Sequence, residues 1–110
     1  MRQHPLLLID DDETLRRLLA GELERRGFDV ATADSVQSAR LALQQREFAV
    51  ALVDLRLPDG DGLDIVRQAR RDAPQTELIV LTAHGSIDTA IAAMREGAFD
   101  YLRKPCSTDE

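Results

Sequence analysis

Cysteine, positive charge and long apolar runs are all scarce in this sequence. The single cysteine, Cys106, cannot form an internal disulfide, so we expect a reducing, cytoplasmic setting. The formal net charge of -6 leaves no basic stripe that could neutralise nucleic-acid phosphates. The apolar run at residues 6–9 is too short for a signal peptide or a membrane span. We therefore expect no membrane association and no direct nucleic-acid contact by this segment.

The composition is typical of one globular domain. The chain has 110 residues, of which 44% are hydrophobic and 31% charged, and these values indicate neither disorder nor a fibrous class. A chain of this length can remove roughly two-thirds of its unfolded surface from water, so it needs no disulfide or structural metal to fold. We therefore expect a single domain over residues 1–110.

One stretch, residues 48–62, organises the rest of the chain. Its first six residues form an apolar run that stops at Asp54, and Pro58, Gly60 and Gly62 then indicate a loop. A short apolar run with such boundaries predicts a strand that is covered on both faces, as in parallel sheets. Asp54 would then lie at the carboxyl end of a central strand, where open α/β sheets bind ligands.

Short apolar runs alternate with stretches of helical spacing, which predicts right-handed βαβ crossovers and a parallel sheet. Ser35 is suited to cap a helix and Gly97 to end one, and the last expected helix should face inward with Ile87, Ala90, Ile91 and Met94. After the fifth strand only residues 106–110 remain, so we expect the chain to be cut where a fifth helix begins. The expected strands are 6–9, 28–32, 48–53, 78–81 and 99–103, and the expected helices are 13–26, 36–43, 63–72 and 87–94.

Polar side chains follow four of these strands at one edge of the sheet. They are Asp10 and Asp11, Asp54, Thr82 and Lys104. Carboxylates a few ångström apart repel by about 4 kcal/mol per close pair at an effective dielectric near 20, so the cluster needs a cation. Mg²⁺ is suitable because it accepts one or two carboxylates, keeps several waters and works with phosphate oxygens.

These groups suit phosphoryl transfer, in which catalysis is mostly positioning and neutralisation of charge. Asp54 would be the nucleophile and would form an aspartyl phosphate. Asp11 and Asp54 would hold the metal, and Asp10 would act through water. Lys104 would pair with the phosphoryl group, and the Thr82 hydroxyl would donate a hydrogen bond to it.

Each of these residues also has a plainer interpretation. The acids at 10–12 can be helix-capping residues favoured by the helix dipole, which is what we expect of Asp12. Thr82 can hydrogen-bond its own backbone, Lys104 can be a solvated charge, and Asp54 can be a turn-forming residue. Their coincidence at one sheet edge favours a functional site.

Four motifs occur in order along the chain: residues 8–12 (LIDDD), 53–62 (VDLRLPDGDG), 81–85 (LTAHG) and 100–105 (DYLRKP). Together they make the whole chain resemble the receiver domain of two-component response regulators. The resemblance implies a flavodoxin-like α/β fold, a doubly wound parallel five-stranded sheet of order 2-1-3-4-5, with the fifth helix missing or truncated. Residues 1–110 would be one receiver domain, cut near the start of its last helix, with no output domain present.

The resemblance implies a phosphorylation-dependent signalling switch. A sensor histidine kinase would pass a phosphoryl group from its phosphohistidine to Asp54, with Mg²⁺ as the cofactor. The backbone carbonyl of Arg56 would be a further metal ligand, and the Lys104–Pro105 peptide would be cis. The domain would not be an enzyme but a phosphoacceptor that promotes its own phosphorylation and dephosphorylation.

The resemblance also implies how the signal leaves the site. Thr82 would turn toward the phosphoryl group while the ring of Tyr101 rotates inward. Arg56 and His84 would flank the phosphoryl group and modulate dephosphorylation, although both can be simply exposed loop residues. The face formed by the fourth helix and the fifth strand would change, and it would be the surface of a homodimer if one forms.

Residues 84–90 and 97–102 look most like the nitrogen-regulatory class of transcriptional activators. The resemblance therefore implies transcription regulation through a downstream, DNA-binding output domain.

Two other functions are alternatives. A phosphatase of the haloacid-dehalogenase type would need an acid two residues after its nucleophile, where this chain has Arg56. A phosphorylation-independent interaction module would show no Mg²⁺-dependent binding of beryllofluoride.

Overall fold

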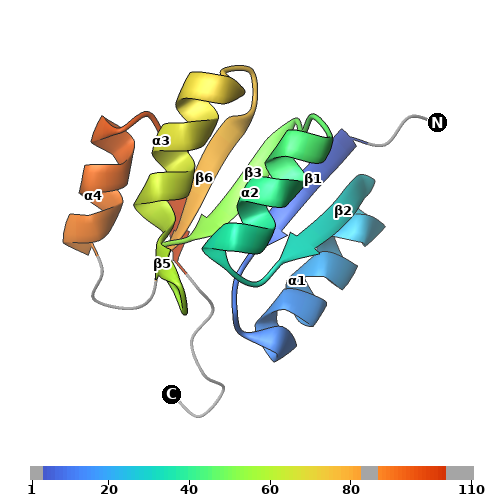
Figure 1. Ribbon diagram of the computed structural model, residues 1–110. Helices are drawn as coiled ribbons and strands as arrows, with labels where there is room; N and C mark the ends of the chain where they lie inside the picture. The colour runs from blue at the N-terminus through green and yellow to red at the C-terminus, as the bar shows by residue number, and fades with distance from the viewer. Residues whose placement is uncertain (1–3, 83–86, 104–110) are drawn as a thin grey trace, which may run out of the picture.

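A parallel sheet of five strands runs through the centre of the computed structural model, which describes residues 4–82 and 87–103 (Figure 1). The strands lie in the order β2-β1-β3-β6-β7. Because β4 and β5 form a separate hairpin, this is the order 2-1-3-4-5 along the main sheet, and the predicted flavodoxin-like fold is confirmed. The strands are β1 (His4–Ile9), β2 (Phe28–Ala33), β3 (Val50–Asp54), β6 (Glu77–Thr82) and β7 (Asp100–Arg103).

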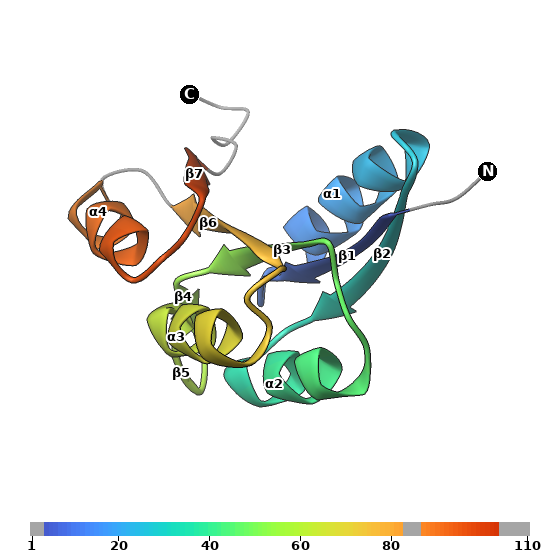
Figure 2. The same ribbon diagram turned by 90° about the horizontal axis from the view of Figure 1, so that it is seen from above.

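Helices cover both faces of the sheet, and Figure 2 shows α1 on one face with α2 and α3 on the other. The larger apolar cluster includes Ile65 of α3 and Ala93 of α4, whereas Leu19 and Leu23 of α1 pack against the smaller one. None of the helices in the described ranges has the length and apolar character needed to cross a membrane. The helices are α1 (Glu13–Arg25), α2 (Val36–Gln45), α3 (Gly62–Asp72) and α4 (Ile87–Arg95).

Strand β1 explains why its sequence is continuously apolar. Successive side chains of a strand point to opposite faces of the sheet. Leu7 and Ile9 belong to the larger cluster, Leu6 and Leu8 to the smaller one, and all four are fully buried. When both faces of a strand are covered, none of its side chains faces water, so no position favours a polar residue. The polar residues therefore begin only where the strand ends.

Local signals at the helix ends act as the sequence predicts. The Asp12 carboxylate caps α1 by accepting the Leu15 amide at 3.1 Å. Ser35 caps α2, where its hydroxyl accepts the Ser38 amide at 3.1 Å in a capping box. Gly97 follows α4 with a φ of 115°, a left-handed conformation that side chains disfavour. These ends fix where each helix starts or stops relative to the sheet.

The central strand and its loop differ from the prediction in detail. Strand β3 begins at Val50 and not at Phe48, whose carbonyl accepts the Thr76 hydroxyl at 2.8 Å. The expected loop after Asp54 contains a two-stranded antiparallel hairpin, β4 (Arg56–Leu57) and β5 (Gly60–Asp61). The hairpin brings the chain directly into α3.

The prediction for α4 was wrong in part. Among the α4 side chains that the structure describes, Ala90 and Ala93 are buried, whereas Ile91 and Met94 are 46% and 37% exposed. The small side chains of Ala90 and Ala93 let α4 lie close to the sheet. The longer side chains of Ile91 and Met94 therefore extend along the outer side of the helix. The expected fifth helix and the Lys104–Pro105 peptide lie outside the described residues.

Candidate functional site at the carboxyl edge of the sheet

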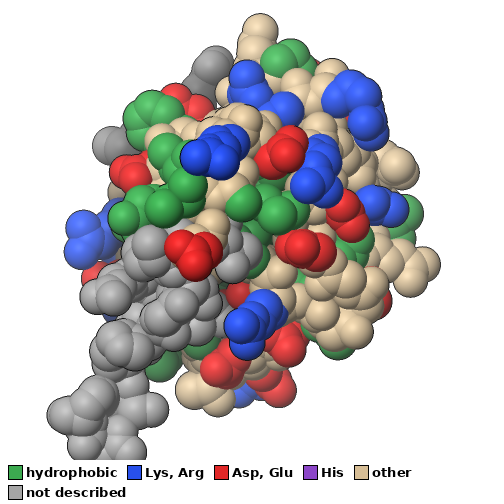
Figure 3. Space-filling model, turned by 90° about the vertical axis from the view of Figure 1, so that its left-hand side faces the viewer, with side chains coloured by type: hydrophobic (Ala, Val, Ile, Leu, Met, Phe, Trp, Pro, Cys, Tyr) green, Lys and Arg blue, Asp and Glu red, His purple; other side chains and the backbone are tan. Residues whose placement is uncertain are grey.

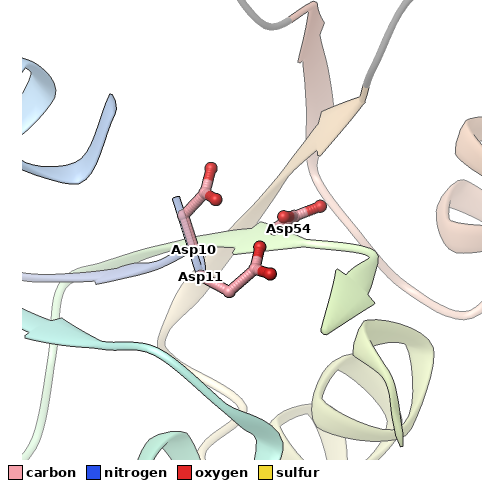
Figure 4. A group of neighbouring side chains, drawn as sticks. All are labelled: Asp10, Asp11 and Asp54. Atoms are coloured by element: carbon pink, nitrogen blue, oxygen red, sulfur yellow. The ribbon is translucent and has the colours of Figure 1, made fainter. Parts of the chain in front are cut away.

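Three carboxylates meet where β1 and β3 end. Asp10 and Asp11 follow β1 directly, and Asp54 is the last residue of β3. The two strands are neighbours with Ile9 opposite Val53, so the residues that follow reach the same point of the edge. One carboxylate oxygen from each acid lies within 4.8 Å of the others (Figure 4). The structure thus brings together the three acids that the sequence predicted.

Two of the three acids are removed from solvent. Asp10 is fully buried and Asp54 is 4% exposed, while Asp11 faces solvent. Carboxylates at such separations repel by about 4 kcal/mol per close pair at an effective dielectric near 20. Buried carboxylates keep their charge when hydrogen-bond donors or cations face them. The cluster therefore costs stability unless neighbouring groups offset its charge.

Backbone amides provide part of that compensation. The Asp12 amide donates to Asp10 Oδ1 at 2.9 Å, and the Arg56 amide donates to Asp54 Oδ1 at 3.0 Å. The Arg16 guanidinium donates to the backbone carbonyl of Asp10 at 2.8 Å and so fixes the chain just after β1. These contacts orient the carboxylates. Three carboxylates with an exposed member are a donor set that fits a hard divalent cation such as Mg²⁺.

Gly62 holds the loop after β3 against the strand. Its amide donates to the Leu55 carbonyl at 3.0 Å. A Cβ atom at this position would lie 2.3 Å from the Asp54 carbonyl oxygen and 2.8 Å from the Leu55 Cα, both backbone atoms that cannot swing aside. Glycine is therefore required here for the close approach of α3 to Asp54. In the sequence this glycine indicated only a turn.

Asp59 is a residue that sequence reasoning missed. It lies in the turn of the hairpin, and its two carboxylate oxygens accept the amides of Val36 at 2.7 Å and Gln37 at 3.0 Å. These N–H groups, Val36 first, hold the pKa of Asp59 below its ordinary value of 3.8. The bonds join residues 23 and 22 positions apart, so no local pattern in the sequence could have indicated them.

The structure describes the other predicted site residues only in part. Thr82 ends β6, the strand next to β3, so its backbone lies at the same edge as Asp54. Arg56 is exposed in β4, with its amide bound to Asp54. Tyr101 in β7 is 37% exposed. The two remaining predicted residues, Lys104 and His84, lie outside the described residues.

A cavity of about 460 Å³ lies at the other end of the sheet. Residues 43–47 and 72–76 line it, and they lead into β3 and β6. It is therefore separated from the carboxylates by the length of the strands. The buried Thr76 hydroxyl in its wall donates to the Phe48 carbonyl, which is a structural bond between two loops. The acidic cluster, not this cavity, is the candidate site.

Comparison with known proteins gives a consistent result. The model of the family described as "Response regulator receiver domain" matches residues 6–110. The chain is 49% identical over 105 residues to the photosynthetic apparatus regulatory protein RegA of Cereibacter sphaeroides, covering 96% of this chain and 57% of RegA. It is 43% identical to the alginate biosynthesis transcriptional regulatory protein AlgB of Pseudomonas aeruginosa, covering 99% of this chain and 24% of AlgB.

Solved structures agree with the sequence relatives. NtrX from Brucella abortus matches with a TM-score of 0.89 and 31% identity, over 98% of this chain and 25% of that one. A response regulator protein from Burkholderia pseudomallei, solved with a phosphorylated aspartic acid, calcium ion and citrate, matches with a TM-score of 0.88 and 34% identity. That match covers 97% of this chain and 63% of the Burkholderia chain.

Proposed function

This chain belongs to the response regulator receiver domain family, with relatives of the nitrogen-regulatory type that its motifs predicted, and we propose that it is a switch operated by phosphorylation of Asp54. The observation that carries the proposal is the cluster of Asp10, Asp11 and Asp54 at the ends of adjacent strands. Close carboxylates repel one another, so three of them at one point of the edge are best explained by a ligand that uses them.

Asp54 accepts the phosphoryl group in this proposal. One of its carboxylate oxygens attacks the phosphorus of a kinase phosphohistidine, and an O–P bond forms while the P–N bond breaks. The electron pair of the broken bond returns to the histidine nitrogen. No base is needed because the attacking carboxylate is already ionised. The domain therefore acts as a phosphoacceptor that assists its own phosphorylation and dephosphorylation, and not as an enzyme with a released product of its own.

Mg²⁺ is the proposed cofactor. When bound, it neutralises charge on the phosphoryl oxygens and on the carboxylates. Asp11 and Asp54 would hold it directly, the backbone carbonyl of Arg56 would be a further ligand, and Asp10 would act through water. The phosphorylated aspartic acid and calcium ion of the Burkholderia protein support this assignment by similarity.

The remaining roles follow from the family resemblance. Lys104 would pair with the phosphoryl group, and Thr82 would donate its hydroxyl to it. Tyr101 would follow the movement of Thr82, which would couple the site to the face of α4 and β7. Arg56 and His84 would tune the rate of dephosphorylation.

The partners are proposed from the relatives and the surface. A sensor histidine kinase would donate the phosphoryl group in the cytoplasm. A DNA-binding output domain is the proposed downstream partner, because AlgB is a transcriptional regulatory protein and the chain spans 24% of it. A second copy would bind the face of α4 and β7, where Ile91, Met94 and Tyr101 are partly exposed. Figure 3 shows hydrophobic side chains on the side of the molecule where α4 lies. Sedimentation of the beryllofluoride-treated chain over a range of concentrations tests this dimer.

Labelling by acetyl phosphate tests the phosphoacceptor. The chain is incubated with acetyl phosphate and Mg²⁺ and is analysed on Phos-tag gels and by intact mass. The wild type should gain one phosphoryl group, Asp54→Asn should gain none, and EDTA should suppress labelling. Asp29→Asn is the matched control, because Asp29 is an exposed acid of β2 that pairs with Arg46 at 3.2 Å. It should be labelled as the wild type is.

Labelling that persists in Asp54→Asn would overturn the assignment of the acceptor. Rapid turnover of p-nitrophenyl phosphate would instead indicate a phosphatase with an aspartyl-phosphate intermediate. A chain that neither accepts phosphoryl nor binds beryllofluoride with Mg²⁺ would be an interaction module. The three outcomes are distinct, so each function has its own measurement.

A further inference from the structure

The turn of the β4–β5 hairpin is bonded to the first turn of α2. Asp59 Oδ1 accepts the Val36 amide at 2.7 Å, and Asp59 Oδ2 accepts the Gln37 amide at 3.0 Å. These amides are among the groups at a helix N-terminus that have no partner within the helix. A carboxylate is also favoured there by the helix dipole. The contact is therefore specific and uses both oxygens of one side chain.

Packing supports the same contact. Val36 is buried, and a Cβ atom on Gly60 would lie 3.3 Å from its Cγ2 atom, so the hairpin already lies against this side chain. Leu57 on the other strand of the hairpin packs against the larger apolar cluster, to which Val36 also belongs. The hairpin is thus seated on α2 by apolar contact as well as by the Asp59 carboxylate.

The base of the same hairpin contacts the acidic cluster. The Arg56 amide donates to Asp54 Oδ1 at 3.0 Å, and the Gly62 amide donates to the Leu55 carbonyl at 3.0 Å. Arg56 is also paired with Asp61 across the hairpin. Only Leu57 and Pro58 separate Arg56 from Asp59 along the chain. A shift at the turn would therefore be transmitted to the backbone that faces Asp54.

We propose that Asp59 is a positioning residue, which ties the hairpin to α2 and so holds the Arg56 backbone in place beside Asp54. The inference rests on the proposed function, in which the Arg56 carbonyl binds the cation. Both oxygens of Asp59 accept amides of α2, so its role requires no contact with the cation or the phosphoryl group. It acts through the hairpin, because it is not itself a metal ligand but fixes the position of one, the Arg56 carbonyl.

Ser35 provides a control for a role confined to helix capping. Its hydroxyl caps the same helix by accepting the Ser38 amide at 3.1 Å, one residue beyond those that Asp59 binds. Ser35→Ala and Asp59→Ala therefore both remove a cap from α2. Only Asp59→Ala also releases the hairpin. The two variants separate the stability of α2 from the geometry at Asp54.

The experiment has a metal-free and a metal-bound readout. Solvent exchange of the Arg56 and Gly62 amides is measured by NMR without metal, and Mg²⁺ affinity is measured by titration calorimetry. Asp59→Ala should speed exchange of both amides and weaken Mg²⁺ binding by about tenfold, the scale seen when an outer-shell contact is lost. Ser35→Ala should leave both readouts at wild-type values. Asp59→Asn keeps one acceptor oxygen and should fall between wild type and Asp59→Ala.

Wild-type exchange and Mg²⁺ affinity in Asp59→Ala would overturn the inference, as would equal changes in Ser35→Ala. If Asp59→Ala does not fold, Asp59→Asn carries the same test. Failure of the proposed function looks different: the wild type itself would then bind no Mg²⁺ and accept no phosphoryl group. The metal-free exchange data would still show whether Asp59 holds the hairpin.

Discussion

The interior of the sheet is apolar and its carboxyl edge is acidic, although the same strands form both. In the interior, Ile9 and Val53 are fully buried among apolar side chains. One residue further along the chain in each case, Asp10 and Asp54 are buried almost as completely but carry carboxylates within 4.8 Å of that of Asp11. The interior stabilises the fold by apolar burial, whereas the edge gathers three carboxylates, a donor set that fits a cation.

The comparison teaches where function can be changed without loss of the fold. Full burial of an apolar side chain stabilises by about 1.5–3 kcal/mol, so interior substitutions should reduce stability. A cluster of like charges destabilises, so neutralising one of its members should increase stability while removing the site. The clearest test is therefore whether substitutions in the interior lower the free energy of unfolding while neutralisation of an acid at the edge raises it.

Ile65→Ala should give the largest effect. Ile65 lies on α3, is fully buried and belongs to the larger apolar cluster. Its truncation should lower the free energy of unfolding by about 2–5 kcal/mol because a cavity remains. Urea denaturation followed by circular dichroism measures the change. A loss below about 1 kcal/mol would mean that this layer repacks easily and that the interior is less decisive than its burial indicates.

Asp10→Asn should act in the opposite direction. The amide side chain keeps an oxygen for the Asp12 amide but removes one charge from the cluster. We expect a gain of about 1–2 kcal/mol in the free energy of unfolding at low ionic strength without metal, because close like charges repel. Millimolar Mg²⁺ should reduce this stability difference between Asp10→Asn and the wild type, because it should stabilise the wild type more. Denaturation curves with and without Mg²⁺ measure both changes.

Asp12→Asn is the control for that gain. Its side chain is exposed and keeps the oxygen that caps α1, so its neutralisation removes charge without relieving the cluster. A small loss is expected there, because negative charge is favoured at a helix N-terminus. If both variants gain stability equally, overall charge and not the cluster is the cause.

The contribution of Asp59 should depend on pH. Its pKa in the folded chain is lowered from 3.8 by the amides of Val36 and Gln37, so the ionised form stabilises the fold. This contribution is complete well above 3.8, declines as the pH falls below that value, and is absent below the lowered pKa. The stability difference between wild type and Asp59→Asn should therefore close in acid. Urea denaturation from neutral pH downward measures it, and a constant difference would contradict the role of the charge.

Leu102→Gln should have the smallest effect. Leu102 is paired with Leu81 in the sheet, so it points to the same face as α1, yet it is 48% exposed. A half-exposed position should change the free energy of unfolding by no more than about 0.5 kcal/mol. Leu81→Gln is the buried counterpart on the same face and should cost far more. A large loss in Leu102→Gln would show that other residues or a second copy cover this part of the edge strand.

Much of the fold could be predicted because its signals are local. The apolar runs gave the positions of all five main strands, and Ser35 and Gly97 marked helix ends through contacts with their immediate neighbours. The alternation of strands and helices then restricted the topology to crossovers of one hand. The acidic cluster followed from the same reasoning, since Asp10, Asp11 and Asp54 each come at the end of a predicted strand.

What the prediction missed depends on contacts between distant residues. The β4–β5 hairpin is too short to show a period, and the bonds of Asp59 cross more than twenty positions. The exposure of Ile91 and Met94 on α4 depends on how closely Ala90 and Ala93 approach the sheet. Helical spacing identifies an apolar stripe but not the part of it that the neighbouring layer covers.

The sequence by itself determined the strands, the helix caps and the residues that carry charge to the edge, because each depends on neighbours a few positions away. The tertiary structure alone decided that the loop after Asp54 is a hairpin fixed to α2, that Gly62 must have no side chain, and that three carboxylates come within 4.8 Å of one another. The physical reason is that these features are distances between separate segments, and such distances are set only when the layers pack.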